Sequence, residues 1–240
     1  MANPVLNEKF LENTNVITEP LTIQGVIQKT IVLFTILVAS AAFLWMKGIE
    51  GHADLVLKLT TVGAITSFVL AFLICFTKKM FLTPLHAVAE GLFIGGFSFV
   101  MEKYCPGIVQ TATLGTFITV ATMLVLYSTR IIKFSDKLMG IVLTATIAVA
   151  GIYFIQWVGS LFGFSIPGIF DNGTFGIVFN LVVIGIAALN LIIDFHFIET
   201  AANTLMPKEY EWYFGFSIMI TVVWVYVEIV RLLVKYNSRD

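Results

Sequence analysis

The chain alternates between long apolar runs and short polar stretches, and the runs have the length of membrane-crossing helices. Six stretches contain no Asp, Glu, Lys or Arg, and they cover residues 30–46, 59–77, 104–129, 138–170, 172–193 and 212–227. Because about 20 helical residues cross a hydrocarbon core of about 30 Å, each stretch can supply one span. The stretch 138–170 has room for more than one span, but Gly159, Gly163 and Pro167 predict that it ends in a loop.

A seventh span is predicted over residues 81–101, although this segment contains His86 and Glu90. The alternative is a loop around Glu90, but the neighbouring sequence, LHAVAEGLFIGGFSFVM, contains no cluster of turn residues. We therefore expect a span with an embedded carboxylate. The full prediction is seven helices, near residues 27–47, 58–77, 81–101, 108–128, 138–160, 174–197 and 212–234.

The composition places this pattern in a membrane. Of the 240 residues, 58% are hydrophobic and 12% are charged, whereas soluble domains average about half and about a quarter. A water-soluble chain of this length could not bury so much apolar surface in one core, so lipid must be part of the solvent. We expect an all-α integral membrane protein with a polar N-terminal tail (1–25) and a seven-helix transmembrane domain (26–235).

The tail and the basic residues predict how the chain lies in the membrane. The first 25 residues are mostly polar, so we expect no secretory signal peptide. Lys and Arg near the span ends favour a cytoplasmic N-terminus by a small margin. The loop with Arg130, Lys133 and Lys137 supports this orientation, whereas the basic C-terminal tail argues against it. We expect a multi-pass protein of the inner (plasma) membrane, and the net charge of −1 gives no support for nucleic-acid binding.

Glu90 is the first candidate for function, because an ionisable residue inside a span costs about 2.5–3.5 kcal/mol on insertion scales and usually faces the protein interior. It lies about 13 Å along its helix at 1.5 Å per residue, near the middle of the membrane. Glu90 would act as a proton carrier or cation ligand, or it would be a neutral side chain hydrogen-bonded to a neighbouring helix. His86, one turn earlier, is a weaker candidate that could instead lie at the interface below Pro84.

Two further acids lie in the last two spans. Asp194 follows Asn180 and Asn190 on a polar stripe of one helix face, although an Asp near a helix end is sometimes only interfacial. Glu228 shares one side of the last span with Arg231, and the i,i+3 spacing also allows the two simply to pair with each other.

Three segments of the sequence resemble the Bax inhibitor-1 family (transmembrane Bax-inhibitor-motif proteins). AEGLFIGGFSF (89–99) is similar to its Glu-Gly signature, NLIIDFHFIE (190–199) to its sixth-helix Asp motif, and the last span with its Arg-Leu-Leu at 231–233 to its final helix. The resemblance extends from residue 23 to about residue 234, and the sequence is most similar to the bacterial branch of the family.

The resemblance implies a pH-sensitive calcium leak, with seven helices arranged so that the last is central and an aspartate pair on helices 6 and 7 senses protons. Asp194 matches the first aspartate. Aligning the last span on Arg231 places the second at Thr221, which is not acidic. Either Glu211 or Glu228 substitutes for it, or gating differs in this chain.

These observations lead to one main hypothesis, a carboxylate ladder of Glu228, Glu90 and Asp194 that passes protons or a hard cation. Carboxylate oxygens suit Ca²⁺, so Asp194 and Glu90 are candidate calcium ligands. We expect no other cofactor, and the expected partners are the lipid bilayer and calcium ions or protons. The side chains expected to support the acids are Asn190, Thr221, Glu211 and Arg231.

Other functional classes remain open. The main alternative is a non-conducting regulatory or stress-response protein that acts through a partner, in which the buried acids only bind helices together. A small-solute transporter ranks lower, because the two halves show no clear pair of broken helices. We expect no enzyme, since no nucleophile–base pairing and no zinc or haem motif is found.

Overall fold

The computed structural model describes residues 19–238, and over this range it is all-α. Its helices are α2 (Ile23–Ile49), α3 (Ala53–Thr77), α4 (Thr83–Tyr104), α5 (Ile108–Ser128), α6 (Asp136–Leu161), α7 (Thr174–Asn203) and α8 (Tyr210–Asn237), with the short 3-10 helix η1 (Met80–Leu82) before α4. In the described part of the chain, seven helices are long and apolar enough to cross a membrane, which confirms the predicted fold class. Most of the predicted tail, residues 1–18, lies outside the described residues, and α2 begins at Ile23.

Local sequence explains where several helices begin. The hydroxyl of Thr22 accepts a hydrogen bond from the Gly25 N–H at 2.9 Å and caps α2, and Ser135 caps α6 in the same way. Between α4 and α5, Gly107 has a φ of 85°, a conformation that favours glycine. The Glu102 carboxylate accepts a hydrogen bond from the Gly107 N–H at 2.6 Å, so this acid at a helix end has a structural role.

α7 shows the largest departure from the predicted boundaries. It was predicted to end near residue 197, but the helix continues to Asn203. The added turns are stabilised by packing, because Ile198 and Ala201 are buried in a cluster with Leu21 and Val26 at the start of α2. Asp194 therefore lies well inside a helix rather than at its end.

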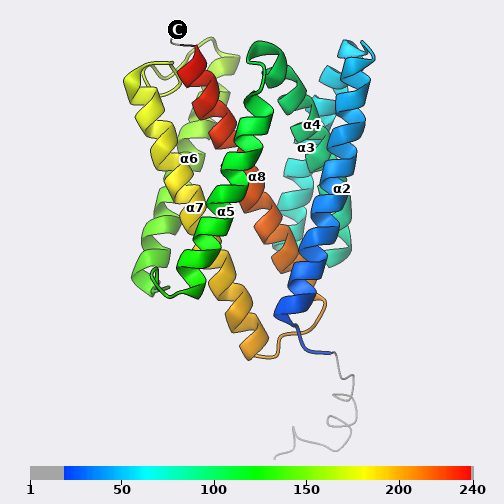
Figure 1. The fold of residues 1–240 in the computed structure, drawn as a ribbon, viewed down its shortest axis with the longest axis vertical. Helices are drawn as coiled ribbons and strands as arrows, with labels where there is room; N and C mark the ends of the chain where they lie inside the picture. Colours follow the sequence, from blue (N-terminus) through cyan, green and yellow to red (C-terminus); the bar gives the residue numbers. More distant parts are fainter. Residues whose placement is uncertain (1–18, 239–240) are drawn as a thin grey trace, which may run out of the picture.

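α8 occupies the centre of the bundle, as the family resemblance implied (Figure 1). It contacts α2 and α4 on one side and α5 and α7 on the other, while α6 lies outermost against α7. Phe216, Met219 and Val223 of α8 are buried in a cluster with side chains of α2, α3 and α4. Val230, farther along α8, is buried against Ile108 and other side chains of α5.

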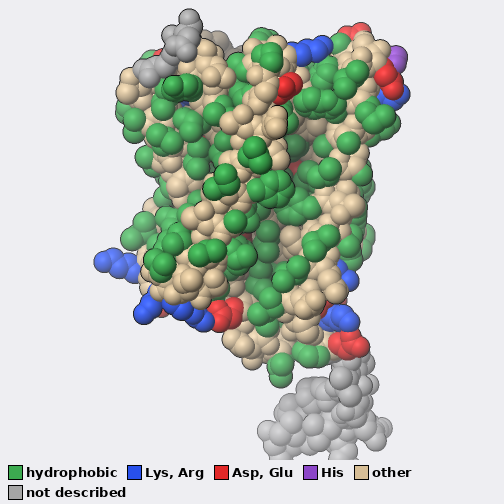
Figure 2. Space-filling model, viewed as in Figure 1, with side chains coloured by type: hydrophobic (Ala, Val, Ile, Leu, Met, Phe, Trp, Pro, Cys, Tyr) green, Lys and Arg blue, Asp and Glu red, His purple; other side chains and the backbone are tan. Residues whose placement is uncertain are grey.

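The outer surface is apolar along its sides, and charged side chains gather at the two ends (Figure 2). Large side chains such as Phe68, Phe76, Phe117 and Phe154 are mostly exposed. Exposed aromatic groups in such numbers are stable only against lipid, so the two charged ends mark the two membrane surfaces.

Residues 19–22 tie the start of α2 to the turn between α7 and α8. Pro20 and Pro207 form an isolated antiparallel bridge, and the Lys208 N–H donates to the Glu19 carbonyl at 2.9 Å. The side chains of Glu19 and Lys208 also form an ion pair, and the hydrogen bond from Lys208 lowers the pKa of Glu19. The first helix and the central helix are thus joined at this end of the bundle.

α4 makes its closest approaches to its neighbours at glycines. A Cβ placed on Gly95 would lie 2.5 Å from the Ala41 carbonyl oxygen and 2.6 Å from the Ala41 Cα of α2. A Cβ on Gly63 of α3 would lie 2.8 Å from the Ala89 carbonyl oxygen of α4. Small residues at these points let backbones pack directly on each other, which is how membrane helices gain contact energy without a hydrophobic driving force.

We expect Gly95→Ala to destabilise the protein, because its new methyl group would meet backbone atoms that cannot rotate away. Overpacking of this kind costs about 1–3 kcal/mol. Gly140→Ala is the matched control, since nothing lies within 4 Å of a Cβ at Gly140. Thermal unfolding in detergent should show a lower midpoint for Gly95→Ala and an unchanged or higher midpoint for Gly140→Ala. Equal midpoints would contradict the close packing of α2 on α4.

Candidate functional site

Asp194 of α7 faces α8 and is held by two hydroxyl groups. Ser217 Oγ donates to Asp194 Oδ1 and Thr221 Oγ1 donates to Asp194 Oδ2, each at 2.7 Å. Ser217 and Thr221 are one turn apart, so their side chains lie on the same face of α8. The carboxylate thus makes a two-point attachment between α7 and the central helix.

Thr221 stands where the resemblance places a second aspartate, and its hydroxyl contacts Asp194 directly. The two positions therefore face each other, as an aspartate pair would. The pair here contains one acid and one neutral donor. Neither Glu211 nor Glu228, the two acids considered as substitutes, hydrogen-bonds to Asp194 in the part of the chain that the structure describes.

Glu211 lies instead at the end of the bundle where α2 begins. Its Oε1 accepts hydrogen bonds from the Thr22 N–H and the Thr22 hydroxyl, both at 3.2 Å, and its side chain is fully buried. An anion at the first turn of a helix is favoured by the free N–H groups and by the helix dipole. Glu211 therefore holds the start of α2 to the start of α8 and takes no part in the Asp194 site.

The polar stripe predicted on α7 is divided between two neighbours. Asn190, one turn before Asp194, donates to Thr146 Oγ1 of α6 at 2.9 Å and to the Ile186 carbonyl at 2.9 Å. It therefore supports the α6–α7 contact rather than Asp194.

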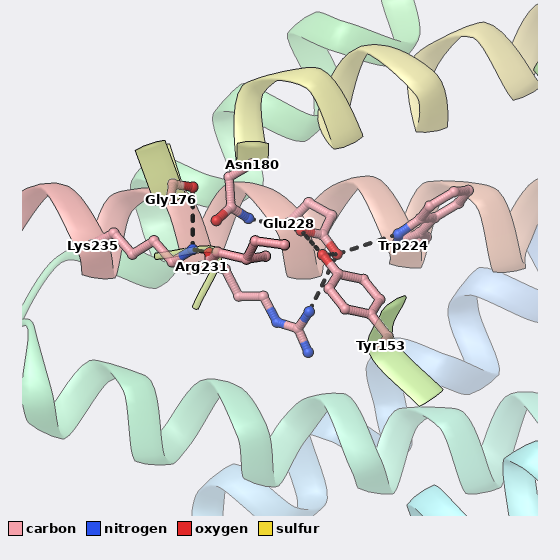
Figure 3. Close-up of polar contacts among 8 residues, drawn as sticks. Tyr153, Gly176, Asn180, Trp224, Glu228, Arg231 and Lys235 are labelled. Atoms are coloured by element: carbon pink, nitrogen blue, oxygen red, sulfur yellow. Dashed lines mark hydrogen bonds and ion pairs between the residues drawn. The ribbon is translucent and has the colours of Figure 1, made fainter. Parts of the chain in front are cut away.

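Glu228 of α8 is the most completely surrounded acid in the bundle (Figure 3). Its side chain is 1% exposed. Tyr153 of α6 donates to both carboxylate oxygens at 2.8 and 2.9 Å, and Asn180 Nδ2 of α7 donates at 2.8 Å. Trp224 Nε1 lies at 3.3 Å and Arg231 Nη1 at 3.4 Å. The predicted pairing of Glu228 with Arg231 is present, but it has the longest distance of the set.

Lys235, two turns beyond Glu228, is also buried. Its Nζ donates to the Ile169 carbonyl at 2.9 Å and the Gly176 carbonyl at 3.2 Å. Figure 3 shows this ammonium group on the same face of α8 as Glu228. It fixes the last turns of α8 to the loop before α7 and to the first turn of α7.

Glu90 and His86 lie together in a different part of the bundle. His86 Nε2 is 3.9 Å from Glu90 Oε2, and Ser67 of α3, whose hydroxyl donates to the Ala64 carbonyl at 3.1 Å, lies beside Glu90. The His86 side chain is 1% exposed, and its ring lies edge-on to that of Phe216 with centroids 4.8 Å apart. Its Nδ1 has no hydrogen-bond partner among the described residues. His86 is therefore buried in the interior of the bundle, in the first turn of α4.

The three acids of the predicted ladder form three separate sites. α4 and α7 do not pack against each other, and Glu90 lies beside His86 whereas Asp194 is held by Ser217 and Thr221. Glu228 is separated from Asp194 by its own set of donors. Among the described residues, no three His, Cys, Asp or Glu side chains come together as a metal-binding group.

Sequence reasoning missed Tyr153, Trp224 and Ser67 as partners of these acids. Tyr153 and Ser67 come from helices far away in the sequence, so no local pattern indicates them. Trp224 was the one case with a local signal, because it lies one turn before Glu228 and shares its helix face.

We expect Tyr153→Phe to destabilise the protein, because it removes a donor from a buried carboxylate. An unsatisfied buried group of this kind costs about 1–3 kcal/mol. Tyr104→Phe is the control, since Tyr104 is 76% exposed. Thermal unfolding in detergent should separate the two variants. If both unfold at the wild-type temperature, the Tyr153–Glu228 hydrogen bonds do not stabilise the bundle.

Comparison with known proteins agrees with this architecture. Residues 3–238 match the family model described as Bax inhibitor 1 like. No curated protein and no solved structure matches the chain. The matched range covers nearly the whole sequence and includes all seven spans together with Glu90, Asp194 and Glu228. The chain belongs to the Bax inhibitor-1-like family of membrane proteins.

Proposed function

We propose that this protein is a cation leak pathway or ion transporter, with Ca²⁺ as the permeant ion, whose activity depends on the ionisation of Asp194. The observation that supports this is the carboxylate of Asp194, held by Ser217 and Thr221 at the contact between α7 and the central helix. An acid inside a span is costly and usually marks an ion or proton path.

The chemistry of this site suits a hard cation. One carboxylate and two hydroxyl groups offer oxygen ligands, and Ca²⁺ takes six to eight oxygens that include water and carbonyl groups. A permeant ion needs weak, partly hydrated binding so that it can leave again. The Asp194 site would therefore bind the ion in passing, and protonation would remove the charge that attracts it.

In the proposed orientation the N-terminus is cytoplasmic and the protein lies in the plasma (inner) membrane. α7 then runs towards the cytoplasm, and Asp194 lies in the cytoplasmic half of the bundle. Glu228 lies nearer the opposite surface, because α8 runs the other way. Glu90 remains part of the proposal as a separate acid within the α3–α4 contact.

We expect Asp194→Asn to lower Ca²⁺ flux about tenfold, which corresponds to the loss of an interaction of about 1.4 kcal/mol. Flux through the wild type should fall as the pH is lowered, because protonation has the same effect as the amide, and the variant should lose this dependence. The measurement is dye-reported Ca²⁺ entry into liposomes that contain the purified protein. Asp136→Asn, at an exposed carboxylate, is the control.

Flux through Asp194→Asn and Glu90→Gln equal to that of the wild type would exclude both acids from the pathway. If the wild type itself shows no flux in liposomes while it remains folded, the alternative of a non-conducting regulator that acts through a partner would be favoured.

Thr221→Asp tests whether the missing second acid sets the pH response. Two carboxylates within hydrogen-bond distance cannot readily both ionise, so one retains a proton to higher pH. We expect flux to be lost at a higher pH in Thr221→Asp than in the wild type. Thr221→Val removes a donor to the Asp194 carboxylate without adding charge, so its midpoint should rise by less than that of Thr221→Asp. A Thr221→Asp profile identical to that of the wild type would contradict a role for this position in proton sensing.

A further inference from the structure

Arg231 is the least firmly held of the groups that contact Glu228. Its Nη1 lies 3.4 Å from Glu228 Oε1, whereas the Tyr153 and Asn180 donors lie within 2.9 Å. Its side chain is 44% exposed and Glu228 is 1% exposed. The guanidinium also lies over the Tyr153 ring, 4.8 Å from its centroid. Arg231 thus extends from the protein surface to a buried carboxylate.

Asn180 adds an unused oxygen beside the same carboxylate. Its Nδ2 donates to Glu228, but its Oδ1 is buried and has no hydrogen-bond partner in the described structure. A buried acceptor without a partner is costly and indicates an interaction not satisfied by this arrangement. Nδ2 faces Glu228 in this arrangement. A half-turn of the amide would direct Oδ1 to a cation bound at Glu228, and Nδ2 would then take the place that Oδ1 has now.

The other nearby cation does not compete for Glu228. Lys235 directs its Nζ to the carbonyl groups of Ile169 and Gly176. Within the described residues, Arg231 is therefore the one positively charged group that contacts the Glu228 carboxylate. Tyr153 and Asn180 are neutral, so their hydrogen bonds do not neutralise the negative charge of Glu228.

We propose that Glu228, Asn180 and Tyr153 form a cation site distinct from that of Asp194, and that the Arg231 side chain is a tethered competitor for it. The occupant is a hard divalent cation such as Ca²⁺, bound by the Glu228 oxygens, Asn180 Oδ1 and the Tyr153 hydroxyl oxygen. Arg231 leaves the carboxylate when the cation enters, which its exposed position permits. This deepens the proposed function by adding a site near the end of the bundle where the C-terminus lies (Figure 1).

Terbium luminescence tests the site directly, because Tb³⁺ prefers the same oxygen ligands as Ca²⁺. Trp224 is hydrogen-bonded to Glu228 and is therefore close enough to sensitise the emission of a bound Tb³⁺. Arg231→Gln should bind Tb³⁺ about tenfold more tightly than the wild type, a gain of about 1.4 kcal/mol. Ca²⁺ should displace the ion. Arg231→Lys keeps a competing charge and should gain less. Lys103→Gln, which removes an exposed cation elsewhere, should bind as the wild type does.

Two further variants locate the signal. Trp224→Phe should reduce the sensitised emission while Ca²⁺ still raises the unfolding temperature. Glu228→Gln should abolish the tight binding of Tb³⁺. The thermal unfolding curve of this variant shows whether it is folded. If Glu228→Gln does not fold, the comparison of Arg231→Gln with Lys103→Gln still decides the proposal. Arg231→Gln binding no tighter than the wild type, or Glu228→Gln binding unchanged, would overturn it.

The binding assay is independent of ion flux. A tighter Arg231→Gln site in a protein that shows no flux would support the cation site and refute the leak pathway. Flux that depends on Asp194, with no change of Tb³⁺ binding in Arg231→Gln, would support the pathway and refute the Glu228 site.

Discussion

A carboxylate inside a hydrocarbon medium must be surrounded by hydrogen-bond donors, and this constraint determines which helices lie beside α8. Water cannot supply the donors there, so neighbouring helices must. Glu228 draws Tyr153 from α6 and Asn180 from α7 to the same point on the central helix. Asp194 of α7 accepts hydrogen bonds from two hydroxyl groups of α8. The acids thus fix the positions of neighbouring helices relative to α8, whereas apolar contacts alone would allow several positions.

The glycine contacts of α4 and the polar contacts of α8 stabilise the bundle in different ways. α4 approaches α2 so closely at Gly95 that backbone meets backbone, which leaves no space for a polar path. The contact of α7 with α8 contains Asp194 and Glu228 instead. A conformational change that opens a path would therefore separate α7 from α8 and leave the α2–α4 packing intact.

The sequence was sufficient to predict the spans, because hydrophobic length and charge position are local properties. The motif alignment on Arg231 assigned Thr221 to the position of the second aspartate, and the structure shows that its hydroxyl contacts Asp194. The sequence was not sufficient to predict that Glu90 lies apart from Asp194, or that Glu211 holds Thr22 at the start of α2. Those results depend on which helices are neighbours in space, and hydropathy contains no information on helix order within a bundle.

The two polar sites of α8 lie on one continuous helix, so a movement of α8 along its axis would displace both. Thr221 and Glu228 are about 10 Å apart along the axis at 1.5 Å per residue. A shift of α8 that lengthens the Thr221–Asp194 hydrogen bond also moves Glu228 relative to Asn180 and Tyr153. Packed interfaces tend to change between discrete arrangements rather than deform continuously. Loss of charge at Asp194, if it shifts α8, would therefore alter the hydrogen bonds that Asn180 and Tyr153 donate to Glu228, without any chain of side chains between the two sites.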